Sequence, residues 1–219
     1  MKRRFFVTAI ITALLMLSSY EATAQTKQSA ELPKYEVGVD FSSLSIRYGP
    51  TLPGLGGRFT YNLNKHVALE AAGYFFPGKC EFCSGQITGH ITEGLFGVKV
   101  GKRFKKWGIF GKARPGFLSL SKGAVDFVLT GAPSPYQFTV VSRSQTNFAL
   151  DLGGVLEFYP SKRIVVRFDG GDTIIHYARR TANYPFQDPN TGAITLSPFT
   201  IPSYTQHSLQ FIGGVGFRF

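Results

Sequence analysis

Hydrophobic and polar residues alternate with a period of two along much of this chain. In the clearest run, residues 209–219, one face is polar or small and the other is apolar, the apolar positions being Leu209, Phe211, Val215, Phe217 and Phe219. Successive side chains of a β-strand point to opposite faces of a sheet, so the pattern predicts a half-apolar strand. Similar runs predict a set of eight strands, which are 35–45, 57–63, 66–76, 93–104, 107–120, 146–159, 163–173 and 205–219.

The connections between these segments alternate between short and long. Tight turns are expected at 62–65, 102–106 and 159–162. Long loops are expected at 46–56, 77–92, 121–145 and 174–204. Short turns at one rim and long loops at the other are typical of a transmembrane β-barrel, in which the turns face the periplasm and the loops are extracellular.

The last two long loops contain alternating runs of their own. Residues 125–129 and 138–141 flank a turn rich in glycine and proline, and residues 193–196 follow the turn residues 188–192. We therefore expect two hairpins that project beyond the membrane. Such hairpins either bind partners by strand addition or cap the lumen.

The parity of each strand assigns one face to lipid and the other to the barrel interior. The predicted lipid face is apolar, with aromatic residues near the strand ends as at membrane interfaces. The interior of an eight-stranded barrel is just wide enough for side chains to fill, and unpaired buried charges are unfavourable, so we expect a salt-bridged, largely plugged lumen. The predicted lumenal charges, seven acidic and seven basic, are Glu36, Asp40, Arg58, Glu70, Glu93, Lys99, Arg103, Lys112, Arg114, Asp151, Glu157, Arg167, Asp169 and Arg218.

Pro115 is the residue that fits the strand pattern least well. Proline has no backbone N–H to donate to a neighbouring strand, and a closed barrel tolerates it only at a rim or an irregularity. We therefore expect a local irregularity in the segment 107–120, relieved by Gly116.

The first 24 residues carry the pattern of a cleaved secretory signal. Basic residues at positions 2–4 precede a short apolar run, and Ala24 ends an Ala-x-Ala cleavage pattern that places Gln25 at the mature terminus. The apolar run is shorter than the ~20 residues that a membrane-spanning helix requires. We expect residues 1–24 to be a signal peptide, 25–34 a short lead-in, and 35–219 one barrel domain.

The strand spacing, the charged interior, the signal pattern and the aromatic end at Phe219 together resemble the eight-stranded outer-membrane β-barrels of the outer membrane protein A/X type. The resemblance covers most of the chain and implies an all-β, antiparallel, up-and-down barrel in the outer membrane of a Gram-negative bacterium. It also implies that Phe217 and Phe219 form the signal read by the barrel assembly machinery. It does not extend to a peptidoglycan-binding domain.

Cys80 and Cys83, separated by two residues, lie in the second long loop. In an exported protein we expect them to form a disulfide. A zinc site would need ligands beyond the nearby His90, and a redox-active pair would need a strand-to-helix context that is missing. We therefore expect no metal and no cofactor.

His207 and Ser208 raise the alternative of a lipid-A-modifying enzyme. Lipid A deacylase barrels use a Ser–His–acid set near the outer surface, but neighbouring residues of a strand point to opposite faces, so this His and Ser cannot easily share a proton. The sequence also shows no constellation that matches lipid A palmitoyltransferase barrels. We expect a barrel without enzymatic activity, with a lipid-A-modifying enzyme and a narrow low-conductance pore as alternatives.

The net charge is +11, or about +9 without Lys2, Arg3, Arg4 and Glu21 of the signal segment, and this excess falls mainly at the two rims because the interior positions balance. Cations of the predicted turns should meet phospholipid headgroups, and those of the loops should meet lipopolysaccharide phosphates. The loop cations are Lys79, Lys122, Arg143, Arg179 and Arg180. We expect a monomer whose partners are outer-membrane lipids, lipopolysaccharide and the assembly machinery, not nucleic acid. Its expected role is envelope integrity or surface interaction through the loops.

Overall fold

The computed structural model describes residues 33–46, 51–77, 89–131, 138–189, 191–192 and 194–219. Among them, no helix is long and apolar enough to cross a membrane. The strands of the described residues are β1 (Tyr35–Ser45), β2 (Thr51–Asn62), β3 (Val67–Phe76), β4 (Ile91–Arg103), β5 (Trp107–Leu129), β6 (Phe138–Phe158), β7 (Ile164–Tyr177), β8 (Arg180–Gln187), β9 (Ile194–Ile201) and β10 (Tyr204–Arg218).

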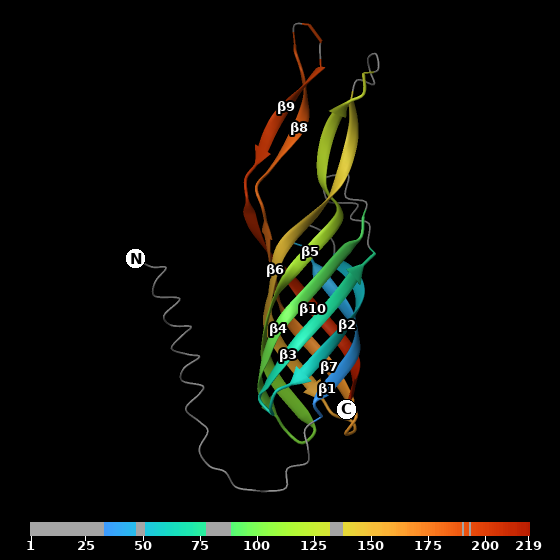
Figure 1. Cartoon of the computed structure of the whole chain (residues 1–219), viewed down its shortest axis with the longest axis vertical. Coiled ribbons are helices and arrows are strands. Elements are labelled where there is room, and N and C mark those ends of the chain that lie inside the picture. Colours follow the sequence, from blue (N-terminus) through green and yellow to red (C-terminus); the bar gives the residue numbers. More distant parts are fainter. Residues whose placement is uncertain (1–32, 47–50, 78–88, 132–137, 190, 193) are drawn as a thin grey trace, which may run out of the picture. The chain divides into compact units, whose positions relative to one another are not determined.

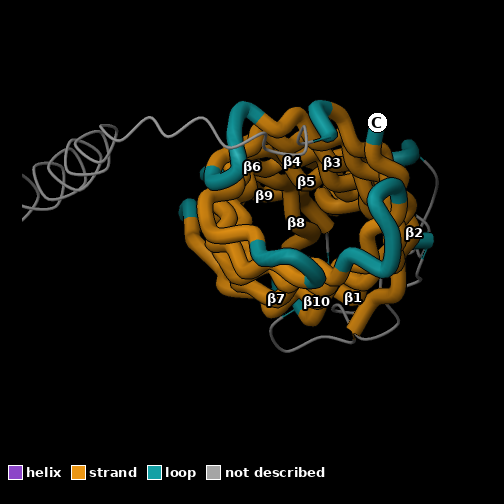
Figure 2. Tube along the Cα trace, turned by 90° about the horizontal axis from the view of Figure 1, so that it is seen from below, coloured by secondary structure: helices purple, strands orange, loops and turns teal. Residues whose placement is uncertain are grey.

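Eight of these strands close into an antiparallel barrel, in the order β1-β10-β7-β6-β5-β4-β3-β2, and β8 and β9 form a separate two-stranded sheet. Figure 2 shows the ring of strands viewed along the barrel. Consecutive barrel strands are neighbours, and β10 closes the ring against β1 through pairs such as Val37↔Phe217 and Val39↔Val215. The predicted all-β, eight-stranded, up-and-down barrel is therefore confirmed.

Burial alternates along the strands with the period that the sequence shows. In β1 the outward side chains of Val37, Val39 and Phe41 are 49%, 72% and 53% exposed, whereas the inward Glu36 and Asp40 are buried. An apolar surface around a polar interior is the reverse of a soluble protein and matches a barrel surrounded by lipid.

The boundary predicted for the second strand is wrong. Residues 46–56 were expected to form a long loop, but β2 already begins at Thr51. Pro53 is compatible with a strand because the pairing of β2 with β3 begins only at Leu55. Glycine at positions 54 and 56 allows close packing, because a Cβ atom at Gly54 would overlap the ring of Phe76 and one at Gly56 would overlap the ring of Tyr74. The turn-forming composition of this segment hid its strand.

Two hairpins extend beyond the other strands, as the sequence predicted (Figure 1). After a register shift between Leu120 and Ala124, β5 and β6 stay paired as far as Leu129↔Phe138. The β8–β9 hairpin pairs from Arg180↔Ile201 to Gln187↔Ile194. The described residues of the last two predicted loops, 121–145 and 174–204, therefore lie largely in paired strands.

The irregularity expected at Pro115 is confirmed as an interruption of pairing on one side of β5. Pairing with β4 stops after Leu95↔Gly116 and resumes at Val98↔Ala113 in the same register. Pairing with β6 continues through Pro115↔Leu150. The missing proline N–H therefore interrupts the ladder without a bulge.

Gly116 lies too close to β4 to carry a side chain, because a Cβ atom would overlap the carbonyl oxygen of Gly94. In Gly111, on the same strand, a Cβ atom would be 3.9 Å from its nearest neighbour, the carbonyl oxygen of Val100. We predict that G116A destabilises the barrel by about 1–3 kcal/mol through overpacking. G111A should change stability by much less. Denaturant unfolding in detergent micelles measures both, and equal midpoints for the two variants would contradict this packing argument.

Candidate functional site: a filled lumen and paired hairpins

The half of the lumen next to the short turns is filled by a network of ion pairs. Arg167 lies at its centre, donating to Asp169 from Nε at 2.5 Å and from Nη2 at 2.8 Å. The same guanidinium binds both carboxylate oxygens of Glu70, with an Nη2–Oε2 distance of 2.9 Å. Such bidentate pairs combine charge with fixed geometry.

Strands β4, β5 and β6 extend this network around the barrel. Arg114 donates to Asp151 Oδ2 from Nε at 2.9 Å and from Nη2 at 2.5 Å. Lys112 Nζ lies 2.8 Å from Asp151 and 3.3 Å from Asp169. Lys99 bridges Glu70 and Glu157, at 3.2 Å from the former. Each of these carboxylates therefore faces at least two cations.

A smaller group joins β1 and β2. Arg58 binds Glu36 at 3.2 Å and also binds Asp40. Its guanidinium lies over Gly38 and Gly216, where a Cβ atom would be 2.9 Å from Cζ and 3.1 Å from Nη2, respectively. Glycine at both positions makes room for the buried cation.

Three predicted lumenal residues differ from the others. Arg103 is partly buried, 3.9 Å from Glu157, and donates to Asn62 Oδ1 at 2.6 Å. Glu93 is buried and accepts a 2.7 Å hydrogen bond from Gln210. Arg218 donates to the Ser161 carbonyl at 3.1 Å and lies over the ring of Tyr159. For Glu93 and Arg218, the contacts found among the described residues include no ion pair.

The loop-side half of the lumen is apolar, which the sequence analysis missed. Inward side chains from all eight barrel strands form its centre, with Phe76 and Leu44 fully buried. The alternation of inward and outward positions along the strands could have revealed this layer, since Leu44, Tyr74, Phe76 and Leu118 all occupy inward positions. The larger members of this layer are Leu44, Leu52, Tyr74, Phe76, Ile91, Leu95, Leu118, Leu120, Ile175 and Ile212.

Both layers exclude water. A water-filled channel would leave the side chains along its wall accessible to solvent, yet Arg114 and Lys99 are 0% exposed and Arg167 is 1% exposed. Between the layers, Gln210 donates to Glu93 and Ser42 and accepts from Thr173 at 2.6 Å. The described lumen is thus filled by an ionic layer, a hydrogen-bonded junction and an apolar layer.

The two projecting hairpins contact each other above the barrel. The backbone N–H of Asn183 in β8 donates to Asp126 Oδ1 in β5 at 2.9 Å, and the Phe127 N–H donates to the same oxygen at 3.0 Å. Phe127 also packs on Tyr184, with ring centroids 5.4 Å apart. Arg180 donates to the Gly123 carbonyl at 3.4 Å. These contacts fix the β8–β9 hairpin against the extension of β5 and β6.

The outer surface carries a polar pair that the sequence analysis missed. Asp172 of β7 and His207 of β10 both face outward near the loops, with Asp172 Oδ2 2.5 Å from His207 Nδ1. The Ser208 N–H donates to Asp172 Oδ1 at 3.1 Å, whereas the Ser208 side chain is buried on the other face. Parity counting from Ile164 and Phe168 would have placed Asp172 outside.

Several predicted residues lie outside the described part of the chain: Cys80, Cys83, Lys79, Ala24 and Gln25. Their disulfide, lipid contact and signal cleavage stay predictions. Phe217 and Phe219 lie on the outer surface, 48% and 60% exposed, beside Tyr35. Their role as an assembly signal also stays a prediction.

Comparison with known proteins finds distant likenesses to outer-membrane proteins of known structure. No family model and no curated protein matches it. The attachment invasion locus protein Ail of Yersinia pestis is 13% identical over 84% of this chain and 96% of its own, with a TM-score of 0.46. Neisserial surface protein A is 12% identical over 84% and 96%, also with a TM-score of 0.46. The outer membrane protease OmpT of Escherichia coli is 9% identical over 90% and 100%, with a TM-score of 0.37.

These likenesses are too distant to carry an argument about this chain. The strand order and the inverted burial pattern, which come from the chain itself, show an eight-stranded β-barrel of the outer-membrane type.

Arg114 tests the ionic layer. We predict that R114M destabilises the barrel by about 3–5 kcal/mol, because it leaves buried carboxylates with too few cations. The matched control is R143M, which removes a 67% exposed side chain 3.8 Å from Asp126 and should cost less than about 1 kcal/mol. Denaturant unfolding compares the two. If the R114M barrel were as stable as the R143M barrel, the expected contribution of the ion-pair network to the stability of the barrel would be contradicted.

Asp126 tests the contact between the hairpins. Its pKa lies below the ordinary value of 3.8, mainly because the Asn183 N–H donates to the carboxylate. The contact should therefore be complete above pH 3.8 and be lost as the pH falls through the lowered pKa. We predict that D126A speeds hydrogen exchange of the Asn183 amide at neutral pH, while D188A, in the β8–β9 turn, does not. Unchanged exchange in D126A would contradict the contact.

Proposed function

We propose that this chain is a monomeric, non-conducting outer-membrane β-barrel that holds two strand hairpins at the cell surface as a binding platform. The observation that carries the proposal is the Asp126–Asn183 contact, which joins the hairpins above a filled lumen. A transport protein needs a path through its barrel, whereas a platform needs a rigid base. The lumen found here fits the second requirement.

The membrane location is supported by the surface of the barrel. Large apolar side chains with exposed fractions of 39–72%, such as Val39, Phe96 and Val98, face outward from the strands. In water such a surface would cause aggregation. In a bilayer the same side chains lie against the hydrocarbon chains of the lipids, where an apolar surface is stable. The signal pattern at residues 1–24 and the rim cations fit export to an outer membrane.

The hairpins offer the features of a protein-binding surface. Phe186 and Phe199 are 59% and 56% exposed, and Tyr184 is 39% exposed. Aromatic side chains contribute much of the energy of protein interfaces. The paired strands also have outer edges that an extended segment can join by hydrogen bonding. The partner class favoured by these features is a protein with an exposed strand.

A hairpin deletion tests the platform. In the variant, residues 179–203 are replaced by a short glycine turn, which removes β8 and β9 and leaves the eight barrel strands. In a strain that lacks the protein, the full chain should restore adhesion of the cells to a protein-coated surface, and the deletion variant should not. The control D188A should restore it like the full chain. Complete restoration by the deletion variant would contradict the platform.

A second candidate function, lipid modification, is favoured by the Asp172–His207 pair. A carboxylate that orients an imidazole leaves the second ring nitrogen free to act as a general base. The pair lies on the outer face near the loops, where ester-linked acyl chains of outer-leaflet lipids would be within reach. His207 would take a proton from water, the hydroxide would add to an ester carbonyl, and the departing alcohol oxygen would receive that proton.

Hydrolysis of lipid esters tests this second candidate. Detergent-solubilised protein is incubated with radiolabelled lipid A, and released fatty acid is measured. The candidate predicts release by the full chain and at least about a hundredfold less by H207Q. H66Q, at a turn on the opposite rim, should keep the full rate. No release by the full chain would rule out the enzyme and leave the platform unaffected.

A further inference from the structure

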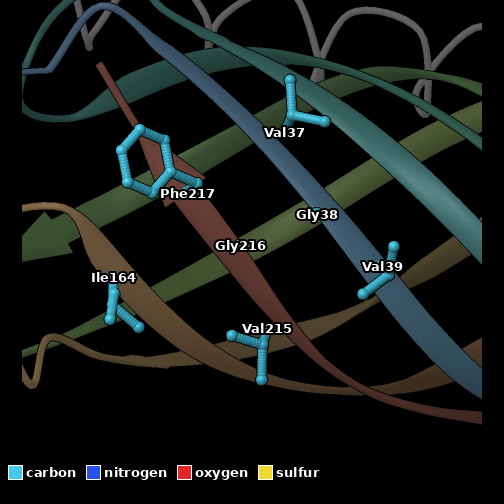
Figure 3. Close-up of a pocket in the computed structure, with 7 residues that line it drawn as sticks. All are labelled: Val37, Gly38, Val39, Ile164, Val215, Gly216 and Phe217. Atoms are coloured by element: carbon cyan, nitrogen blue, oxygen red, sulfur yellow. The ribbon is translucent and has the colours of Figure 1, made fainter.

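A groove of about 310 Å³ lies on the outer surface of the barrel where β1, β10 and β7 meet (Figure 3). Its floor is the backbone of Gly38 and Gly216, which pair with each other across the seam that closes the barrel. Arg58 occupies the lumenal side of both glycines. The groove is therefore built on a part of the seam that the lumenal network holds in place.

The walls of the groove are apolar. One row of side chains runs across the strands from Val37 through Phe217 to Ile164, and a second row contains Val39 and Val215. Figure 3 shows these side chains around the glycine backbone. A concave surface lined by valine, isoleucine and phenylalanine fits a hydrocarbon chain and offers no hydrogen bond to a polar ligand.

Two cations stand at the turn-side end of the groove. Lys162 and Arg163 are exposed and directly precede the wall residue Ile164. The Arg218 N–H donates to the Arg163 carbonyl at 2.7 Å, which ties this turn to the closing strand. Lysine and arginine side chains bind phosphate oxygens through charge-assisted hydrogen bonds. An apolar groove that ends at two cations is therefore complementary to a phospholipid, which has apolar acyl chains and an anionic phosphate.

We propose that the groove binds one phospholipid of the leaflet on the turn side, with an acyl chain along its walls and the phosphate at Lys162 and Arg163. The proposal rests on the membrane location proposed above. A second copy of the chain is a poorer occupant, because the groove has seven lining residues and a stable protein interface uses roughly 20–30 residues on each side. The bound lipid would cover the seam between the first and last barrel strands.

Native mass spectrometry tests the apolar part of the site. The full chain is refolded in detergent with phosphatidylethanolamine and phosphatidylglycerol, and retained lipid is measured after detergent exchange. We expect one phospholipid per barrel, and at least about fivefold lower retention in V39F/V215F, whose two rings fill the groove. The matched control is V98F/V100F on β4, which changes two outward valines that are each 39% exposed. That control should retain the lipid.

The phosphate contact has its own pair of variants. K162Q/R163Q should lower retention by a similar factor, because the groove then lacks its cationic end. K105Q/K106Q removes two exposed cations of another turn and should leave retention unchanged. A lack of retained phospholipid in the full chain, or equal retention in V39F/V215F and V98F/V100F, would overturn the proposal.

Other occupants give different results. A dimer signal that V39F/V215F abolishes would show that the groove is a contact between two copies. Retention of added lipopolysaccharide in place of phospholipid would overturn the assigned leaflet. Insertion into liposomes separates this proposal from the membrane location on which it rests. If all variants insert but retain lipid equally, only the groove proposal fails, whereas a full chain that does not insert contradicts the proposed function as well.

Discussion

The structure depends on one constraint, which is that every charge inside an eight-stranded barrel needs a partner within the same narrow cross-section. Burying an unpaired ion costs several kcal/mol, and the lumen has little room for water. Arg167 and Arg114 meet this constraint by sharing the carboxylates of Glu70, Asp151 and Asp169 among strands β3, β5, β6 and β7. Arg167 and Asp169 both lie on β7, but the other pairs join different strands, so the network also fixes how the strands are placed around the ring.

The position of the charges along the barrel follows from the same constraint. The ionic layer fills the turn-side half, and the larger apolar side chains, such as Phe76 and Leu118, fill the loop-side half. The lumen is therefore closed by two different kinds of packing in series. The hairpins are therefore not needed to close the barrel. For this reason we treat them as a binding surface and not as a gate.

Much of this architecture could be predicted from the sequence, because a period of two carries both the strand positions and the two faces. Twelve of the fourteen predicted lumenal charges take part in ion pairs. The partner of each charge could not be predicted, since it depends on strand register. The early start of β2 was hidden by Pro53 and its neighbouring glycines. The Asp172–His207 pair and the Asp126–Asn183 contact join segments far apart in sequence, and no local pattern reveals them.

The central claim is that the lumen itself is sealed, and single-channel recording in planar bilayers tests it most directly. The full chain and the variant without β8 and β9 are compared under the same voltage and salt. We expect both to insert and neither to show discrete conductance, because the ionic and apolar layers remain in both. Discrete conductance steps from the full chain would contradict the filled lumen. Steps from the deletion variant alone would show that the hairpins provide the seal.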